Sequence, residues 1–257
     1  MSSKQLFFNS FSKKFQKNHK KMSTILENYL KNPNEKNIHD IRVAIRRLDA
    51  SINILPQILQ NKNKLRKLHS TYKKFFKANS KIRDTDIISQ KIAKFSSNPF
   101  ASHILKNLQK ERKKNLQSAC KIGIKLQKYK KIKLKNKIST DELKKNFDKA
   151  ALSLDDKIQK KIPIVMGSSK AISELHELRK DCKKLRYLME LSSFSKQPSA
   201  FIIKLKQMQA LMGNIHDNDI TIEFLKDEKN TALSEILNNE NLEREKNYSK
   251  LVTFFQR

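Results

Sequence analysis

The sequence is poor in residues that break helices and in residues that stabilise small folds covalently. Its 257 residues include 3 glycines, 5 prolines, 2 cysteines and no tryptophan. So few turn-forming residues favour long helices over a fold built from many short strands. Cys120 and Cys182 are far apart and form no CxxC metal motif, so we expect two buried free thiols and a reducing compartment. A chain of this length can bury a core without disulfides or metals.

Long apolar runs and acidic residues are also scarce. No segment approaches the roughly 18 apolar residues that a membrane span requires, so we expect a cytoplasmic protein with no membrane partner. Acidic residues number 25 against 56 Lys and Arg, which leaves a formal net charge of +31. Self-repulsion of this size favours a polyanionic partner, although a Lys-rich composition with a generally basic surface gives the same total. The positions of the charges must decide between these two interpretations.

Apolar residues recur with helical period along nearly the whole chain. Ser139 followed by Glu142 forms a capping box that opens a helix, and Pro163 with Gly167 predicts a loop. Residues 128–138 alternate apolar residues and lysines, which leaves helix and strand open at this junction. The pattern predicts helices within residues 6–29, 33–55, 65–76, 84–98, 100–126, 139–158, 169–194, 198–212, 217–226 and 231–255.

Two segments of the first half of the chain recur in the second half. IHDIRVAIRRL from Ile38 matches LHELRKDCKKL from Leu175, and KKFFKANSKIRDTDI from Lys73 matches KQMQALMGNIHDNDI from Lys206. The order is the same, and the offset between the copies is 137 residues for the first pair and 133 for the second. We therefore predict an internal duplication within a single domain of residues 1–257, with residues 1–138 as the first half and 139–257 as the second.

The first repeated segment places basic side chains on one helix face. His39, Arg42 and Arg46 have the spacing i, i+3, i+7, so they lie at intervals of about one turn. Cations at this spacing repel one another, which predicts an anionic ligand or compensating carboxylates. The second copy repeats the pattern with His176, Arg179, Lys183 and Arg186, while Arg47 and Lys184 lie one step around the helix.

Two interpretations remain open for the aspartates of the second repeated segment. Asp84 and Asp217 either compensate the neighbouring cations or cap the helices that follow them. Asp86 and Asp219 offer the same compensation. The lysines of residues 106–137 show no register with the repeat, so we interpret them as solvated surface.

These segments resemble the CHAD family, whose name stands for conserved histidine α-helical domain. The resemblance rests on the HxxRxxx[RK][RK]L motif at His39, its copy at His176 followed by LRYLME, and the RDTDI and HDNDI segments. It covers about residues 5–255. It implies an all-α, stand-alone CHAD domain made of two four-helix-bundle-like halves related by a pseudo-twofold axis. It also implies binding of inorganic polyphosphate in a basic channel or surface between the halves.

The resemblance also implies which residues bind, by position. Asp49 occupies the position that matches Arg186, and His216 occupies the position that matches Arg83, so we expect a less symmetric channel to which the second half contributes more. Protonation of the two motif histidines near pH 6.5 predicts tighter binding at pH 6 than at pH 8. The implied set is His39, Arg42, Arg46, Arg47, His176, Arg179, Lys183, Lys184 and Arg186, with Lys73, Lys77, Arg83 and Lys206 as weaker candidates.

Two other functions compete with polyphosphate binding. A nucleic-acid-binding protein fits the charge, but the aromatic content is 7% and most Phe and Tyr residues belong to apolar stripes instead of stacking platforms. A metal-dependent phosphohydrolase would use His39-Asp40 and His216-Asp217, yet neither pair is kept as a unit in the other copy. We therefore expect a binding protein and no enzyme, with no catalytic residue, cofactor or metal, located in the cytoplasm and associated with polyphosphate granules.

Overall fold

A computed structural model describes residues 3–95, 98–129, 139–192, 199–228 and 231–256, and within these ranges every regular element is helical. The all-α prediction is confirmed. The helices are α1 (Ser3–Lys31), α2 (Glu35–Asn53), α3 (Gln57–Gln60), α4 (Asn63–Ile92), α5 (Pro99–Gln127), α6 (Thr140–Gly167), α7 (Ile172–Ser192), α8 (Ala200–Asp227) and α9 (Ser234–Phe255), with short 3₁₀ turns η1 (Ala93–Phe95) and η2 (Thr231–Leu233).

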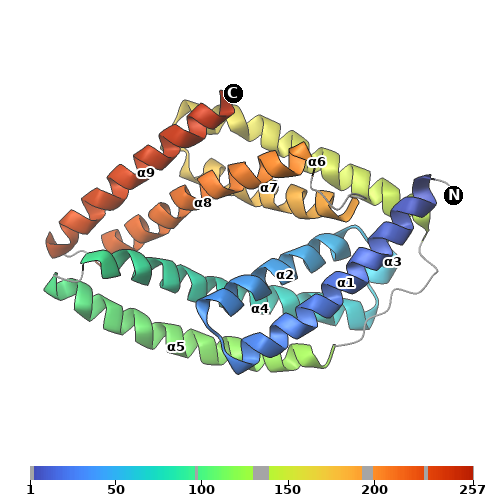
Figure 1. Ribbon diagram of the computed structural model, residues 1–257, viewed down its shortest axis with the longest axis horizontal. Coiled ribbons are helices and arrows are strands. Elements are labelled where there is room, and N and C mark those ends of the chain that lie inside the picture. Colours follow the sequence, from blue (N-terminus) through green and yellow to red (C-terminus); the bar gives the residue numbers. More distant parts are fainter. Residues whose placement is uncertain (1–2, 96–97, 130–138, 193–198, 229–230, 257) are drawn as a thin grey trace.

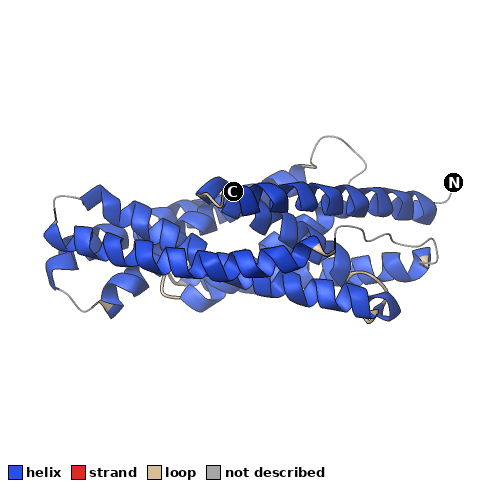
Figure 2. Ribbon diagram, turned by 90° about the horizontal axis from the view of Figure 1, so that it is seen from below, coloured by secondary structure: helices blue, strands red, loops and turns tan. Residues whose placement is uncertain are grey.

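The helices form two groups along an elongated molecule (Figures 1 and 2). In Figure 1, α1, α2, α4 and α5 lie below, and α6, α7, α8 and α9 lie above. The groups meet where α2 packs against α7 and α4 packs against α8. The two repeated segments fall on these same helices, the first on α2 and α7 and the second on α4 and α8. This correspondence fits the internal duplication, which stays a prediction.

The apolar stripes pack into three clusters of buried side chains. The largest lies in the first group, where Phe11, Phe15 and Phe75 are fully buried, and it extends to Leu188 of α7. A second cluster surrounds Met212 within the upper group. The third joins α4 and α5 to α8 and α9 at the far end of the molecule. Apolar packing therefore bridges the two groups at both ends.

Ion pairs also join the two groups at two separate places. Near α7, Arg47 Nε lies 3.0 Å from Glu190 Oε2, and Lys14 Nζ donates to the Glu190 carbonyl oxygen at 2.8 Å. Near α9, Lys91 Nζ lies 2.5 Å from Oε2 of Glu240, a carboxylate that is 1% exposed. Because partly buried ion pairs are weakly screened by solvent, these contacts fix the relative positions of the groups.

Helix boundaries differ from the sequence-based prediction in three places. Helices α4 and α8 run unbroken through Asp84 and Asp217, so the interpretation of these aspartates as N-caps is wrong. Helix α6 continues past Pro163 to Gly167, where a loop was expected. There the Tyr248 hydroxyl lies 2.8 Å from the Val165 carbonyl oxygen and 3.2 Å from that of Met166, and it supplies the donor that the last turn lacks.

Other local predictions are confirmed. The Ser139 side chain accepts a hydrogen bond from the Glu142 backbone N–H and caps α6. Both cysteines are free and Cys182 is buried, as predicted, but Cys120 is only half-buried. Residues 128 and 129 form a turn after α5, and the rest of the junction, 130–138, lies outside the described residues.

Candidate functional site

Four basic side chains of the repeated motif come together where α2 meets α7. Arg46 of α2 lines a cavity of about 380 Å³ together with Arg179 and Lys183 of α7. Arg42, one turn before Arg46, lies close enough to Arg179 that the two charges disfavour each other. The helical spacing of the motif thus places two cations from each group at one seam. We call Arg42, Arg46, Arg179 and Lys183 the cation cluster.

Burial makes the charged forms of this cluster costly. Desolvation, reinforced by neighbouring cations, lowers the pKa of Arg42 to about 10 and the pKa of Arg179 to about 10. The same causes lower the pKa of Lys183 to about 6, because desolvation acts together with the charges of Arg179, Arg46 and Arg42. An anion at this position would relieve both desolvation and repulsion.

Within the described ranges, no carboxylate forms an ion pair with any member of the cation cluster. Two of their nitrogen atoms, Arg42 Nη1 and Arg179 Nε, are buried and have no hydrogen-bond partner among the described residues. Buried donors without partners are rare in folded proteins and cost about 1–3 kcal/mol each. The cluster is therefore arranged to receive acceptors from outside the chain.

An aromatic ring holds two of the guanidinium groups in place. The Cζ atoms of Arg42 and Arg46 lie 4.9 Å and 4.8 Å from the ring centroid of Phe76 on α4. A cation at this distance over the face of a ring is attracted to it. Phe76 therefore positions both guanidinium groups without neutralising them.

Two carboxylates face the cluster from the opposite pair of helices. Asp84 of α4 and Asp217 of α8 each have a pKa raised by desolvation, and the charges of Arg42 and Arg179 oppose that increase for Asp84. Each aspartate lies mid-helix, so compensation of the cations is the interpretation that the geometry retains. Their neighbours Asp86 and Asp219 are instead taken by ion pairs within each group, to Arg112 and Arg244 respectively.

The histidines of the motif occupy different surroundings in the two groups. His39 is exposed at the start of α2, whereas Nδ1 of His176 lies 3.3 Å from Nδ1 of His216 on α8. Desolvation and nearby cations lower the pKa of all three histidines. Desolvation, with a contribution from the neighbouring cations, therefore places the protonation of His39 and His176 below their ordinary pKa of 6.5 in the free protein. The expected pH dependence of binding stays a prediction.

Three further candidates are held by carboxylates. Arg186 Nη1 lies 2.6 Å from Glu190 Oε1, so Glu190 receives both Arg186 and Arg47. Lys184 Nζ lies 3.3 Å from Asp181 Oδ1. Only the Arg47 pair joins the two groups, because Arg186 and Glu190 both belong to α7. Its pairing with Glu190 means that Arg186 does not give the second group the surplus of free charge that was expected of it.

Of the four weaker candidates, one lines the larger cavity. Lys73 lines the cavity, and Arg83 lies 3.9 Å from Glu35. Lys77 and Lys206 are exposed on α4 and α8 and do not line the cavity. Within the weaker set, Lys73 and Arg83 are near the cation cluster: Lys73 lines the cavity, and Arg83 lies close enough to Arg42 that their charges disfavour each other.

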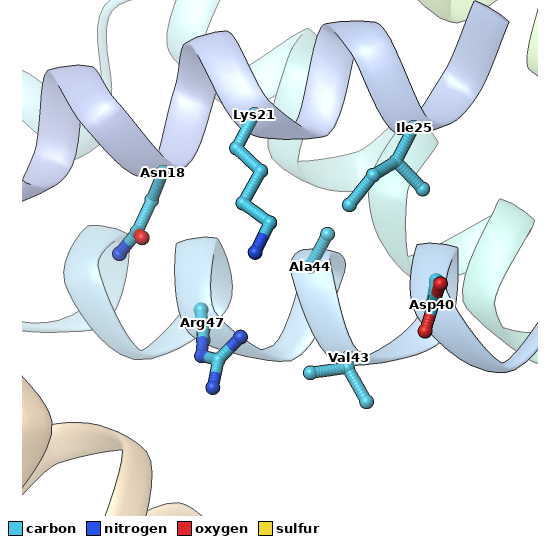
Figure 3. Close-up of a pocket in the computed structure, with 7 residues that line it drawn as sticks. All are labelled: Asn18, Lys21, Ile25, Asp40, Val43, Ala44 and Arg47. Atoms are coloured by element: carbon cyan, nitrogen blue, oxygen red, sulfur yellow. The ribbon is translucent and has the colours of Figure 1, made fainter. Parts of the chain in front are cut away.

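A second, smaller cavity of about 170 Å³ lies between α1 and α2 (Figure 3). Lys21 of α1 points toward α2 beside Arg47, and Asp40 lies farther along α2. Asp40 brings a negative charge to this cavity and Arg47 is paired with Glu190, so its lining offers less positive charge to an anion than the lining of the larger cavity.

Two searches of the described part of the chain found nothing. No helix there is both long and apolar enough to cross a membrane. No group of three or more His, Cys, Asp or Glu side chains there is arranged to hold a metal ion.

Comparison with known families identifies the architecture. The model of the CHAD domain family matches residues 14–226, which is most of the chain and includes all residues of the cation cluster.

The chain belongs to the CHAD domain family.

A solved structure agrees with the family assignment of this CHAD domain. The crystal structure of the CHAD domain from the plant Ricinus communis superimposes with a TM-score of 0.60 and 12% sequence identity, over 95% of this chain and 86% of the plant chain. At this identity the likeness concerns the fold alone. A search of curated proteins found no match.

Sequence reasoning missed several residues that shape the site. Phe76 was interpreted as part of an apolar stripe, Tyr72 likewise, and Glu190 was noted only within the LRYLME segment. The sequence held one signal for Phe76, namely its spacing in the second repeated segment. It lies three residues after Lys73 and eight residues before Asp84, which places it on the inner side of α4.

Proposed function

We propose that this CHAD domain binds inorganic polyphosphate at the seam between α2 and α7. The observation that carries the proposal is the cation cluster, whose members are partly buried, free of carboxylate ion pairs in the described ranges, and contributed equally by the two groups. Such a cluster stabilises neither group by itself. Its chemistry suits a ligand that offers many phosphate oxygens at short intervals.

Polyphosphate matches the chemistry of the cluster. Guanidinium forks bind phosphate oxygens bidentately, and a lysine ammonium acts as a mobile point charge. The chain's net charge of +31 would draw the polymer from a distance, and Lys73 in the lining of the larger cavity extends the basic surface away from the seam. Because released counterions supply much of the binding free energy, affinity should fall steeply as salt rises.

A binding assay against competing polyanions tests the proposal. Polyphosphate, RNA and duplex DNA of equal total charge would be titrated at fixed salt, with the wild type and with a variant carrying Arg42→Gln, Arg46→Gln, Arg179→Gln and Lys183→Gln. The matched control neutralises four exposed lysines of α5, namely Lys110, Lys113, Lys121 and Lys125.

We expect the cluster variant to lose at least about a hundredfold in polyphosphate affinity, because two lost charge-assisted hydrogen bonds already account for that factor. The α5 control should lose less than about tenfold, since solvent screens exposed charges. Equal losses in the two variants would contradict the proposed site. Tighter binding of RNA or DNA than of polyphosphate would establish the nucleic-acid alternative instead.

We also propose that the domain binds without catalysis. Incubation of polyphosphate with the protein and Mg²⁺ or Mn²⁺ should release no phosphate above the level seen with the cluster variant. Release that requires His39 and Asp40, or His216 and Asp217, would support the phosphohydrolase alternative.

In the cell, we propose a cytoplasmic protein that associates with polyphosphate granules. A fluorescent fusion should gather on granules and disperse when the cation cluster is neutralised. A wild-type fusion that stays diffuse in granule-bearing cells would contradict this location.

A further inference from the structure

The larger cavity has an apolar interior that a string of phosphates does not use. Its walls include Ile45, Ile54, Leu154 and Leu188, contributed by α2, the segment after α2, α6 and α7. The basic side chains of Arg46, Lys73, Arg179 and Lys183 line the same cavity. Pockets for small molecules in proteins combine such apolar walls with a few polar anchors, and about 380 Å³ lies within their usual size range.

One of the residues that line this cavity has a buried hydroxyl group without a partner among the described residues. Tyr72 lines the cavity, its side chain is 1% exposed, and its hydroxyl oxygen has no hydrogen-bond partner among the described residues. Arg179, which lines the same cavity, carries a second orphan donor at Nε. Two unsatisfied donors belonging to residues of one cavity indicate that a ligand brings acceptors into it.

We propose that this cavity binds a single-chain amphipathic anion, with one phosphate or carboxylate head and one hydrocarbon tail. The head contacts Arg46, Arg179 and Lys183 and accepts from the Tyr72 hydroxyl, while the tail covers Leu154 and Leu188. This site goes beyond polyphosphate binding, because it depends on the apolar walls as well as on the cations.

The composition of the lining selects this class of ligand. A neutral hydrocarbon would leave the cations and the Tyr72 hydroxyl without partners, which favours a ligand with a charged head. Inorganic phosphate alone would leave the aliphatic walls exposed to water. A molecule that satisfies both parts of the cavity gains from each, and the length of its tail should control its affinity.

Binding of alkyl phosphates of increasing length to the full-length protein tests the proposal. Butyl, hexyl and octyl phosphate would be titrated by calorimetry below their micelle concentrations, beside octanoate, inorganic phosphate and the neutral octyl glucoside. We expect affinity to rise about threefold to fourfold for each methylene buried, so octyl phosphate should bind at least about tenfold tighter than butyl phosphate. Octanoate separates a carboxylate ligand from a phosphate ligand.

Three variants locate the binding. Tyr72→Phe keeps the ring and removes the donor, and it should weaken octyl phosphate about twofold to tenfold. Ala50→Leu with Ala150→Leu fills the cavity and should abolish the dependence on tail length, whereas Ala210→Leu, exposed on α8 outside the cavity, should change nothing.

The outcomes separate this inference from the proposed function. Equal affinity for butyl and octyl phosphate, or tail-length dependence that survives the filled cavity, would overturn the inference even if polyphosphate binds. Tail-length dependence without polyphosphate binding would overturn the proposed function and leave the amphipathic site standing. Octyl glucoside binding as tightly as octyl phosphate would show that the cations play no part.

Discussion

The two groups of helices share a scaffold but present their cations in different ways. In each, an aspartate of the second repeated segment pairs with an arginine of the following helix, Asp86 with Arg112 and Asp219 with Arg244. In the first group, Arg42 and Arg46 are both stacked on Phe76. Gln209 stands at the matching position of the second group.

Gln209 contacts α7 through hydrogen bonds, whereas Phe76 contacts two arginines of the cation cluster through its ring. The Gln209 side chain accepts from Arg186 at 2.9 Å and donates to the Cys182 carbonyl oxygen, so it supports the interior of α7 instead of the cation cluster. The second group therefore offers Arg179 with an orphan Nε and Lys183 with a pKa lowered to about 6 by desolvation and by neighbouring cations. Three members of the cation cluster are arginines that stay charged at neutral pH, and only Lys183 of the second group needs a ligand in order to become charged there.

The largest expected effect separates the two groups directly. Arg42→Gln with Arg46→Gln should weaken polyphosphate binding about a hundredfold at pH 7.5, because two charge-assisted interactions are lost. Arg179→Gln with Lys183→Gln should weaken it about tenfold, since Lys183 is mostly uncharged in the free protein at that pH. Calorimetric titration measures both, and a larger loss in the second pair would reverse the comparison.

The junction between the groups provides the next largest effect. Glu190→Gln removes the acceptor of Arg47 and Arg186 and should lower the free energy of unfolding by about 1–2 kcal/mol, because both arginines are only partly exposed. Urea denaturation measures this change. Polyphosphate affinity should change less than threefold, and a gain above that would mean that Arg47 and Arg186 join the site once released.

Removing the ring beneath the arginines should have a smaller effect. Phe76→Leu keeps an apolar side chain and should weaken polyphosphate binding about fivefold, since each cation–π contact contributes about 0.5–1 kcal/mol. Phe100→Leu, an exposed phenylalanine of α5, is the matched control. Fluorescence competition would detect the difference, and identical affinities for the two variants would remove the positioning role of Phe76.

The last expected effect is a pH dependence that originates in Lys183 of the second group. Because the pKa of Lys183 is about 6 in the free protein and a bound anion raises it, binding takes up a proton above pH 6. Affinity should therefore fall about threefold to tenfold from pH 6 to pH 8.

Two variants test whether Lys183 or the motif histidines cause the pH dependence. Lys183→Arg should bind at pH 8 as tightly as at pH 6, because arginine stays charged across this range. His39→Ala with His176→Ala should keep the dependence of the wild type. If polyphosphate affinity did not change with pH in the histidine variant, the histidines and not Lys183 would cause the pH dependence.

Sequence periodicity identified the helices and the helix faces but not where they end. Asp84 and Asp217 resemble N-caps because local sequence cannot distinguish a capping aspartate from one that faces a cation on a neighbouring helix. The helix that was expected to break near Pro163 continues to Gly167, and its last turn receives a donor from Tyr248, 85 residues from Pro163 in sequence. Tertiary contacts decide each case.

The cation cluster could be predicted because the repeat places Arg42 and Arg179, and Arg46 and Lys183, at matching positions. The sequence did not predict that Arg47, Lys184 and Arg186 form ion pairs with carboxylates. These three residues lie on the same helices, and their fate depends on Glu190 and Asp181, whose pairing is visible only once the helices are packed. The charge pattern of the sequence predicts a basic helix face, whereas the packing of the helices decides which of its basic residues form ion pairs and which can contact a ligand.

The ion pairs at Glu190 and Glu240 have a consequence for kinetics. Since they already hold the two groups together without ligand, capture of a polymer needs no closing motion. Stopped-flow traces should then contain a single exponential whose rate grows linearly with polymer concentration and reaches no plateau. The binding site would then be preformed, the association rate would be set by the frequency of encounters with the polymer, and the dissociation rate would set the lifetime of the complex.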